Sequence, residues 1–327
     1  QVALHAVARG EFARAAALGP VAIEALVSAA NAGPFNQRVA AIEALSQISD
    51  TRVVKPLLAA LKCEDSAVRV AAVEALARIG DPQAFDALVP LLKDKVNRVR
   101  GAAVEAVRKL GGARAVTALV SVVRDSDWDV RRAAAEALGK LKDPASVDAL
   151  AAATRDKDHD VRQAAITALG QINSELALES LILALKDEQS SIRQAAAAAL
   201  RRINPEWNLT PAVRLVLPEF KAALKDKEYW VRQAAAEVLA LIGEVRALPS
   251  TETTFTDAAH YRRKAALDIL VHTLKDRDRD LRQAAAEALG RLGQSQAVSA
   301  LEAAMQDMDA GVRQAASQAL AGLQSNA

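Results

Sequence analysis

One thirteen-residue pattern recurs throughout the chain, and its clearest copy is LRQAAAEALGRLG, from Leu281 to Gly293. Each copy has an arginine, which follows an aliphatic residue in every copy but the first, with alanine three positions and an aliphatic residue seven positions after the arginine. A unit repeated in this way buries its apolar face only by stacking on its neighbours, so the period dictates a repeat architecture. The arginines are 31 residues apart except at insertions of eight and nineteen residues: Arg38, Arg69, Arg100, Arg131, Arg162, Arg193, Arg232, Arg282 and Arg313.

The apolar residues of each copy lie three and four positions apart, which is the spacing of one helix face. In the clearest copy Leu281, Ala285 and Leu289 share that face, and Gly293 ends the helix. A second apolar run with the same spacing precedes each copy and predicts a partner helix. We therefore predict an all-α fold, a right-handed α-solenoid of about nine stacked antiparallel helix pairs.

The pattern also divides the chain, and we expect the segments to form one continuous solenoid. They are an N-terminal capping helix or degenerate repeat (1–19), six regular repeats (20–205), a seventh repeat with a lengthened approach (206–244), an eighth with a Ser/Thr-rich loop insertion (245–293) and a ninth, C-terminal repeat (294–327). In the first segment we expect Leu4, Val7, Phe12 and Leu18 to cover the first repeat. Gln1 in place of Met, and no polar helix after Leu323, lead us to expect a segment of a longer protein.

A short acidic turn joins the two helices of most units. One Asp stands six residues before the arginine, and a second stands four residues before it, where it can cap the second helix. The second group is Asp65, Asp127, Asp158, Asp278 and Asp309.

This 31-residue helical pair, with Asp six residues before Val-Arg and Ala-Ala after it, resembles the HEAT repeat, most closely the short HEAT-like class first associated with phycobilin lyases. The resemblance covers roughly residues 20–323. It implies a structural ladder between neighbouring repeats, because guanidinium and carboxylate match in fork geometry. The ladder would join Asp94, Asp125, Asp156, Asp187, Asp226, Asp276 and Asp307 to Arg100, Arg131, Arg162, Arg193, Arg232, Arg282 and Arg313, with Asp276 beside Arg282. Ala32 and Cys63 hold the acid's position in the first two units, so we expect the ladder to fail there.

The overall charge is balanced, with 42 Lys and Arg against 40 Asp and Glu. This balance gives no reason to expect nucleic acid or a membrane surface as the main partner. A single cysteine, Cys63, excludes an internal disulfide and fits the reducing cytoplasm. No apolar run reaches the roughly 18 residues of a membrane span.

The residues that carry chemistry are scattered. None of His5, His159, His260 and His272 stands at a catalytic spacing from Cys63, and no glycine-rich phosphate loop occurs. We predict no enzyme activity, no catalytic residue, no metal site and no cofactor.

Large aromatic and charged side chains interrupt the aliphatic pattern at turns and insertions. Two interpretations stay open: the aromatics pack on the preceding turn, or they anchor a partner, since Trp and Tyr are enriched at interfaces. The basic cluster after the second insertion is either a solvated helix face or a contact for phosphates. The candidate partner-binding residues are Trp128, His159, Trp207, Tyr229, Trp230, His260, Tyr261, Arg262, Arg263 and Arg279.

The second helices are expected to line a concave surface. Gln and Glu recur there four positions apart, as at Gln283 and Glu287, which fits either surface pairing or a polar groove for a peptide. We therefore predict a non-catalytic protein-interaction scaffold or adaptor that binds another protein or an extended peptide segment. Two alternatives remain: a bilin-lyase-like or chromophore-handling protein, which the resemblance implies, and a protein that binds nucleic-acid phosphates through local basic patches.

Overall fold

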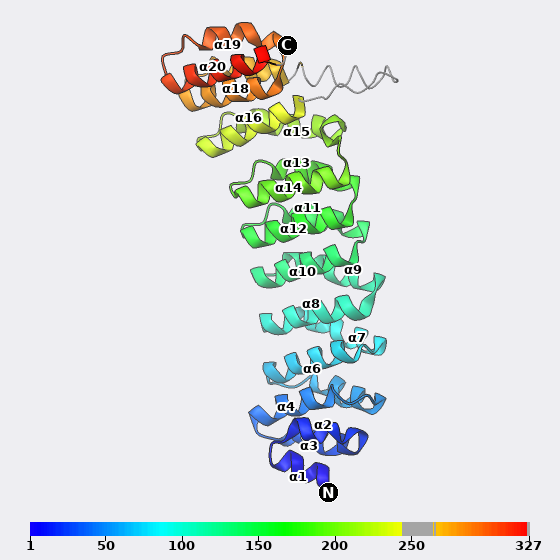
Figure 1. Ribbon diagram of the computed structural model, residues 1–327. Coiled ribbons are helices and arrows are strands. Elements are labelled where there is room, and N and C mark those ends of the chain that lie inside the picture. The colour runs from blue at the N-terminus through cyan, green and yellow to red at the C-terminus, as the bar shows by residue number, and fades with distance from the viewer. Residues whose placement is uncertain (244–263, 265, 326–327) are drawn as a thin grey trace. The chain divides into compact units, whose positions relative to one another are not determined.

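The computed structural model describes residues 1–243, 264 and 266–325, and within these ranges it contains helices and turns but no β-strand (Figure 1). The chain forms two compact units, Gln1–Ile172 and Asn173–Ala327, called unit 1 and unit 2 below. The predicted all-α solenoid of stacked helix pairs is confirmed. None of the described helices is long and apolar enough to span a membrane.

Unit 1 consists of helix pairs in which a short first helix, usually extended by a 3-10 turn, precedes a longer second helix. The first helices and turns are η1 (Gly19–Ala22), α3 (Ile23–Ala32), η2 (Thr51–Val53), α5 (Val54–Ala60), η3 (Pro82–Ala84), α7 (Phe85–Leu88), η4 (Val89–Lys93), α9 (Ala113–Val120), η5 (Ser121–Arg124), η6 (Pro144–Ser146) and α11 (Val147–Ala153). The second helices are α4 (Phe35–Leu45), α6 (Ser66–Ile79), α8 (Asn97–Gly111), α10 (Trp128–Leu141) and α12 (His159–Ile172).

Unit 2 continues the same alternation. Its first helices and turns are η7 (Glu175–Ala177), α13 (Leu178–Ala184), η8 (Trp207–Leu209), α15 (Ala212–Ala223), a helix over residues 266–273, η9 (Ser295–Ala297) and α19 (Val298–Ala304). Its second helices are α14 (Ser190–Ile203), α16 (Tyr229–Gly243), α18 (Arg279–Leu292) and α20 (Ala310–Ser325).

Second helices pack closely on one another within each unit. In unit 1 α6 packs on α8, α8 on α10 and α10 on α12, and in unit 2 α16 packs on α18 and α18 on α20 (Figure 1). The repeated alanine three positions after each arginine is fully buried, from Ala41 to Ala316. A Cβ on Gly139 would lie 2.8 Å from Ala168, and one on Gly290 would lie 2.7 Å from Ala319. Small residues therefore set how near the helices approach.

The first 19 residues form two short helices, α1 (Val2–Ala8) and α2 (Phe12–Ala17), where we expected one capping helix or a degenerate repeat. The expectation that Leu4 and Leu18 cover the first repeat is wrong, because these side chains are 60% and 38% exposed. The small side chains are buried instead: Ala3, Ala6, Ala15 and Ala16.

The predicted helix caps are confirmed. Each capping aspartate accepts a hydrogen bond from the backbone amide two residues later, at distances of 2.8 to 3.0 Å. These bonds satisfy amides that have no partner inside the helix. The caps are Asp65, Asp127, Asp158, Asp278 and Asp309.

Arginines bridge neighbouring repeats with complete fork geometry, as four pairs within the described ranges show. In each case Nε and Nη2 donate to the two carboxylate oxygens of an Asp 25 residues later, at 2.6 to 2.8 Å. Nη1 of the same arginine donates to a backbone carbonyl in its own turn, as from Arg100 to Asp94 at 2.9 Å. The guanidinium thus ties its own turn to the next one. The pairs are Arg69–Asp94, Arg100–Asp125, Arg131–Asp156 and Arg282–Asp307.

The predicted direction of the ladder is therefore wrong: the arginine of one repeat binds the Asp of the following repeat. Arg282 donates to the Asp307 carboxylate, whereas its hydrogen bond to Asp276 goes to the backbone carbonyl and not to the carboxylate. Cys63 in place of an acid does not remove the ion pair of Arg69, because the partner of Arg69 is Asp94 in the following repeat. Instead it leaves Arg38 without an acid 25 residues on, and Arg38 donates to the Gly33 carbonyl at 2.8 Å.

The two insertions interrupt the ladder. No ion pair joins Arg193 to Asp226, although the structure describes both residues. Arg232 pairs with Asp278 at 2.9 Å and Asp280 at 3.6 Å instead of with Asp276. The added residues shift the following turn relative to the arginine, so the 25-residue register is lost.

Burial and ion pairing act in opposite directions on the ladder carboxyls. Burial alone raises the pKa of Asp94 and Asp156, but hydrogen bonds from Arg69 and Arg131 and from backbone amides outweigh it, so each pKa lies below its usual value. The hydrogen bond from Arg282 likewise lowers the pKa of Asp307. The carboxylates are therefore ionised in the folded protein at neutral pH.

Replacing Arg131 with Ala is expected to destabilise the protein strongly. The change leaves the Asp156 carboxylate, only 13% exposed, without its cation. Removing one partner of a buried pair costs about 3–5 kcal/mol. Urea denaturation followed by circular dichroism measures the loss, and hydrogen exchange locates it in α10 and α12. The control is Arg193→Ala, which removes carbonyl hydrogen bonds alone and should cost about 1 kcal/mol. Equal losses would contradict a bridging role.

Acid should unfold the protein through the same carboxyls. Because their folded pKa values are lowered, their stabilisation is complete above the unfolded Asp pKa of about 3.9 and is lost as pH falls through the lower folded values. The urea midpoint should stay constant from about pH 7 to 5 and fall steeply below about pH 4. Asp156→Asn should start from a lower midpoint and lose less on acidification. A midpoint independent of acidity would refute this account.

Candidate functional site

The turns of unit 1 form a regular row, which we call the turn edge: residues 63–66, 94–97, 125–129 and 156–160. Each ladder aspartate stiffens its turn by accepting a hydrogen bond at 2.9 Å from the amide two residues later, as Asp125 does from Asp127. The bridging arginine that follows in the same repeat donates a hydrogen bond to the backbone carbonyl of this aspartate, as Arg131 does to Asp125 at 2.9 Å. The side chains between these fixed points are therefore presented by a rigid backbone.

Trp128 is the first residue of α10, and its side chain stands on the turn edge with 44% of its surface exposed. The corresponding residue of the preceding repeat is Asn97, which donates to the capping Asp127 at 2.6 Å and lowers its pKa. In unit 2 the corresponding Arg279 approaches the capping Asp309 at 3.7 Å. In these two repeats the position carries a polar side chain that contacts the next cap, whereas Trp128 places a large exposed ring there.

His159 occupies the same position in α12 and is also exposed. Its Nε2 lies 3.3 Å from Asp160 Oδ1, and the two residues with Asp158 place one donor atom each within 4.8 Å of one another. These groups surround the N-terminus of α12, where the helix dipole disfavours a cation. They make a polar rim next to Trp128 along the turn edge.

Trp207 has to be removed from the candidate partner-binding residues. The structure buries its side chain, which is 7% exposed, in η8 of unit 2. The first insertion thus provides a core residue, in a turn that packs against α14, α15 and α16. Arg279 is 70% exposed and pairs loosely with Asp280 at 3.5 Å, an arrangement that contributes little to stability.

Several candidates lie outside what the structure describes. Tyr229 and Trp230 begin α16, but their side chains are outside the described part. His260, Tyr261, Arg262 and Arg263 fall outside the described residues altogether.

On the exposed face of several second helices, side chains pair within the same helix. Gln233 and Gln283 donate to the glutamate four residues later at 3.3 and 3.1 Å, as predicted for surface pairing. In α8 Arg108 binds Glu105 at 2.7 Å, and this hydrogen bond lowers the pKa of Glu105. The surface beside the turn edge is therefore polar and ordered by its own ion pairs.

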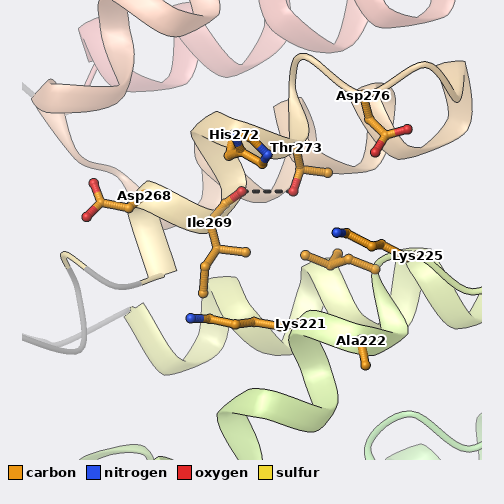
Figure 2. Close-up of a pocket in the computed structure, with 9 residues that line it drawn as sticks. Lys221, Ala222, Lys225, Asp268, Ile269, His272, Thr273 and Asp276 are labelled. Carbon is orange, nitrogen blue, oxygen red and sulfur yellow. Dashed lines mark hydrogen bonds between the residues drawn. The ribbon is translucent and has the colours of Figure 1, made fainter.

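A cavity in unit 2 was not predicted from the sequence. It lies between α15 and the helix over residues 266–273, has a volume of about 770 Å³, and is called the α15 groove below (Figure 2). The only sequence feature that pointed to it was the nineteen-residue insertion before the eighth repeat, which moves Asp276 away from Arg232. Its walls are Lys221, Ala222, Leu224 and Lys225 on one side and Asp268, Ile269, His272, Thr273 and Asp276 on the other.

Comparison with known families decides what kind of repeat this is. A family model described as HEAT repeats matches residues 20–108, 54–126, 97–166, 116–201 and 253–321, and a model of the single HEAT repeat matches residues 216–246. The chain belongs to the HEAT-repeat family. The closer resemblance to the phycobilin-lyase class stays a prediction, and no curated protein matches the chain.

The chain is similar to two solved structures, of which the first shares its fold. A chain from the structure of Kap95p with RanGDP has a TM-score of 0.56 and 15% identity, covering 94% of this chain and 46% of that one. An engineered protein has a TM-score of 0.45 and 22% identity, covering 98% of this chain and 94% of that one. At these identities the likeness concerns the fold alone.

The two tryptophans of opposite exposure should differ sharply in their effect on the stability of this HEAT array. Trp207→Ala removes a buried indole and should cost about 3–5 kcal/mol. Trp128→Ala removes a half-exposed ring and should cost about 1 kcal/mol or less. Thermal unfolding followed by circular dichroism checks both. A loss for Trp128→Ala as large as that for Trp207→Ala would mean that Trp128 is a packing residue.

Proposed function

We propose that this HEAT-repeat chain is a non-catalytic scaffold or adaptor in the cytoplasm, and that the turn edge of unit 1 binds an extended segment of another protein. The observation that carries the proposal is the exposure of Trp128, 44% of whose side chain faces solvent at a position that holds polar residues in the neighbouring repeats. Tryptophan in such a setting is the residue type that most often dominates binding energy at protein interfaces.

The surroundings of Trp128 support an anchor role. Arg132, one turn along α10, binds Asp129 and Glu136 at 2.6 Å each and so holds a polar surface in place next to the ring. Asp158, His159 and Asp160 form the polar rim on the side of the next repeat. An apolar centre within a polar rim is the usual arrangement of an interface.

The shape of the surface favours an extended segment. The turns repeat at the same register along unit 1, so a chain lying across them meets the same backbone frame at each step. Variation in side chains at one position, Ser66, Asn97, Trp128 and His159, then provides the specificity. No described residue adds support for a bilin-handling role or for nucleic-acid phosphates, and neither is proposed.

Truncating Trp128 should abolish capture of a partner without unfolding the chain. Immobilised wild-type chain and Trp128→Ala are compared for the proteins each retains from a lysate of the native source. Loss of an interface anchor costs at least about 2 kcal/mol, so the partner's affinity should fall roughly thirtyfold or more. The control is Val21→Ala, which changes an 80% exposed apolar side chain elsewhere in unit 1 and should retain the partner. Equal retention by all three proteins would reject the turn edge as the binding surface.

A further inference from the structure

The α15 groove separates positive and negative charge onto opposite walls. Lys221 and Lys225 stand on the α15 side, and Asp268 and Asp276 stand on the other (Figure 2). None of these four side chains makes an ion pair within 4.0 Å with another residue of the described part of the chain. An occupant that complements both walls must therefore carry both signs of charge.

The insertion explains why the Asp276 carboxylate lines the groove and is not bound by the arginine of the preceding repeat. In regular repeats the ladder aspartate is bound by the arginine of the preceding repeat, as Asp307 is by Arg282. At the eighth repeat Arg232 binds Asp278 and Asp280, and the carboxylate of Asp276 faces the groove instead. The ladder position, which forms an ion pair between repeats at Asp307, therefore lines the groove at Asp276.

The walls favour a helical occupant over an extended one. Both are helices whose backbone groups are largely bonded internally, and the Thr273 hydroxyl donates to the Ile269 carbonyl at 2.8 Å. An extended peptide would find few backbone partners here, whereas a helix satisfies its own amides and carbonyls. Leu224 and Ile269 supply apolar contact between the charged positions.

Charged and polar side chains follow one another at intervals of four residues along each wall, with Lys225 and Asp276 just beyond the ends of their helices. Lys221 and Lys225 are four residues apart, and Asp268, His272 and Asp276 follow one another at intervals of four. Asp268 and His272 lie within the helix over residues 266–273 and are about 6 Å apart along its axis, whereas Asp276 lies in the turn that follows this helix. A helix with acidic residues four apart on one side and basic residues four apart on the other meets both series.

We propose that the α15 groove binds a charged amphipathic helix of another protein, its acidic side against Lys221 and Lys225 and its basic side against Asp268 and Asp276. The surface is separate from the turn edge and does not depend on Trp128. A free polyanion fits less well, because Asp268 and Asp276 repel it from the same cavity. The volume of about 770 Å³ accepts the inserted side chains of such a helix while its body lies along the opening.

The test uses designed peptides and the full chain. A fluorescein-labelled, alanine-based helical peptide carries Glu at two positions four apart on one side and Lys at two positions four apart on the opposite side. Its binding by fluorescence anisotropy should be about tenfold tighter than that of a peptide of the same composition with scrambled charges. Equal binding of the two peptides overturns the proposal.

Charge reversal locates the site. Lys221→Glu with Lys225→Glu should weaken the patterned peptide about tenfold, and a peptide with Lys in place of its two Glu residues should recover the binding. Lys95→Glu with Lys157→Glu makes the same charge change on exposed residues of unit 1 and should have no effect. Thermal unfolding verifies that both double variants fold. If reversal at Lys221 and Lys225 changes nothing, the groove is not the binding site.

Two further measurements distinguish this proposal from a simple anion site and from the binding proposed at the turn edge. Competition by inorganic phosphate, or equally tight binding of an all-Glu peptide, would show a simple anion site and overturn the helix proposal. Trp128→Ala should leave peptide binding unchanged, so failure of the turn edge and failure of the groove give different results.

Discussion

The structure depends on the arginine that reaches from one repeat to the next. A guanidinium has five N–H donors and cannot lose its charge, so burying it requires acceptors on several sides. Arg131, 5% exposed, finds them in the Asp156 carboxylate and in the carbonyls of Asp125 and Ser126. Two turns that are far apart in sequence are thereby fixed at one distance and one register.

The ladder specifies alignment, while apolar burial supplies cohesion. Ala134 and Leu138 are fully buried in α10, and the equivalent residues are buried in each neighbouring helix. Aliphatic contacts of this kind tolerate sliding, because they are not directional. The fork of hydrogen bonds is directional, so it selects one alignment among those that the aliphatic surfaces permit. Where an insertion removes this selection, at Arg193 and Arg232, the following ladder aspartates, Asp226 and Asp276, line cavities.

Local features of this fold follow from the sequence, and features that join distant residues follow only in part. The period, the helix pairs and the caps at Asp65 and Asp127 were predicted because each depends on neighbours within a few positions. The direction of the ladder was not, since Asp276 and Asp307 stand at equivalent offsets and only the stacking decides which one Arg282 reaches. An insertion has no period from which to deduce burial, and so the inward position of Trp207 and the α15 groove became apparent only in three dimensions.

The same bridges that hold the array would lower the cost of the binding that we propose at the turn edge. A partner that orders a flexible surface spends part of its interaction energy on lost conformational freedom. Around Trp128 that freedom is already removed: Asp127 caps two amides of α10, Asp125 closes the turn, and Arg131 holds the turn to the rest of unit 1. The indole side chain has only two rotatable bonds, so the partner that we propose would spend little interaction energy on ordering it. The hydrogen bonds that align neighbouring repeats would thus also present, on a rigid backbone, the few side chains that depart from the repeat pattern and that we propose give specificity.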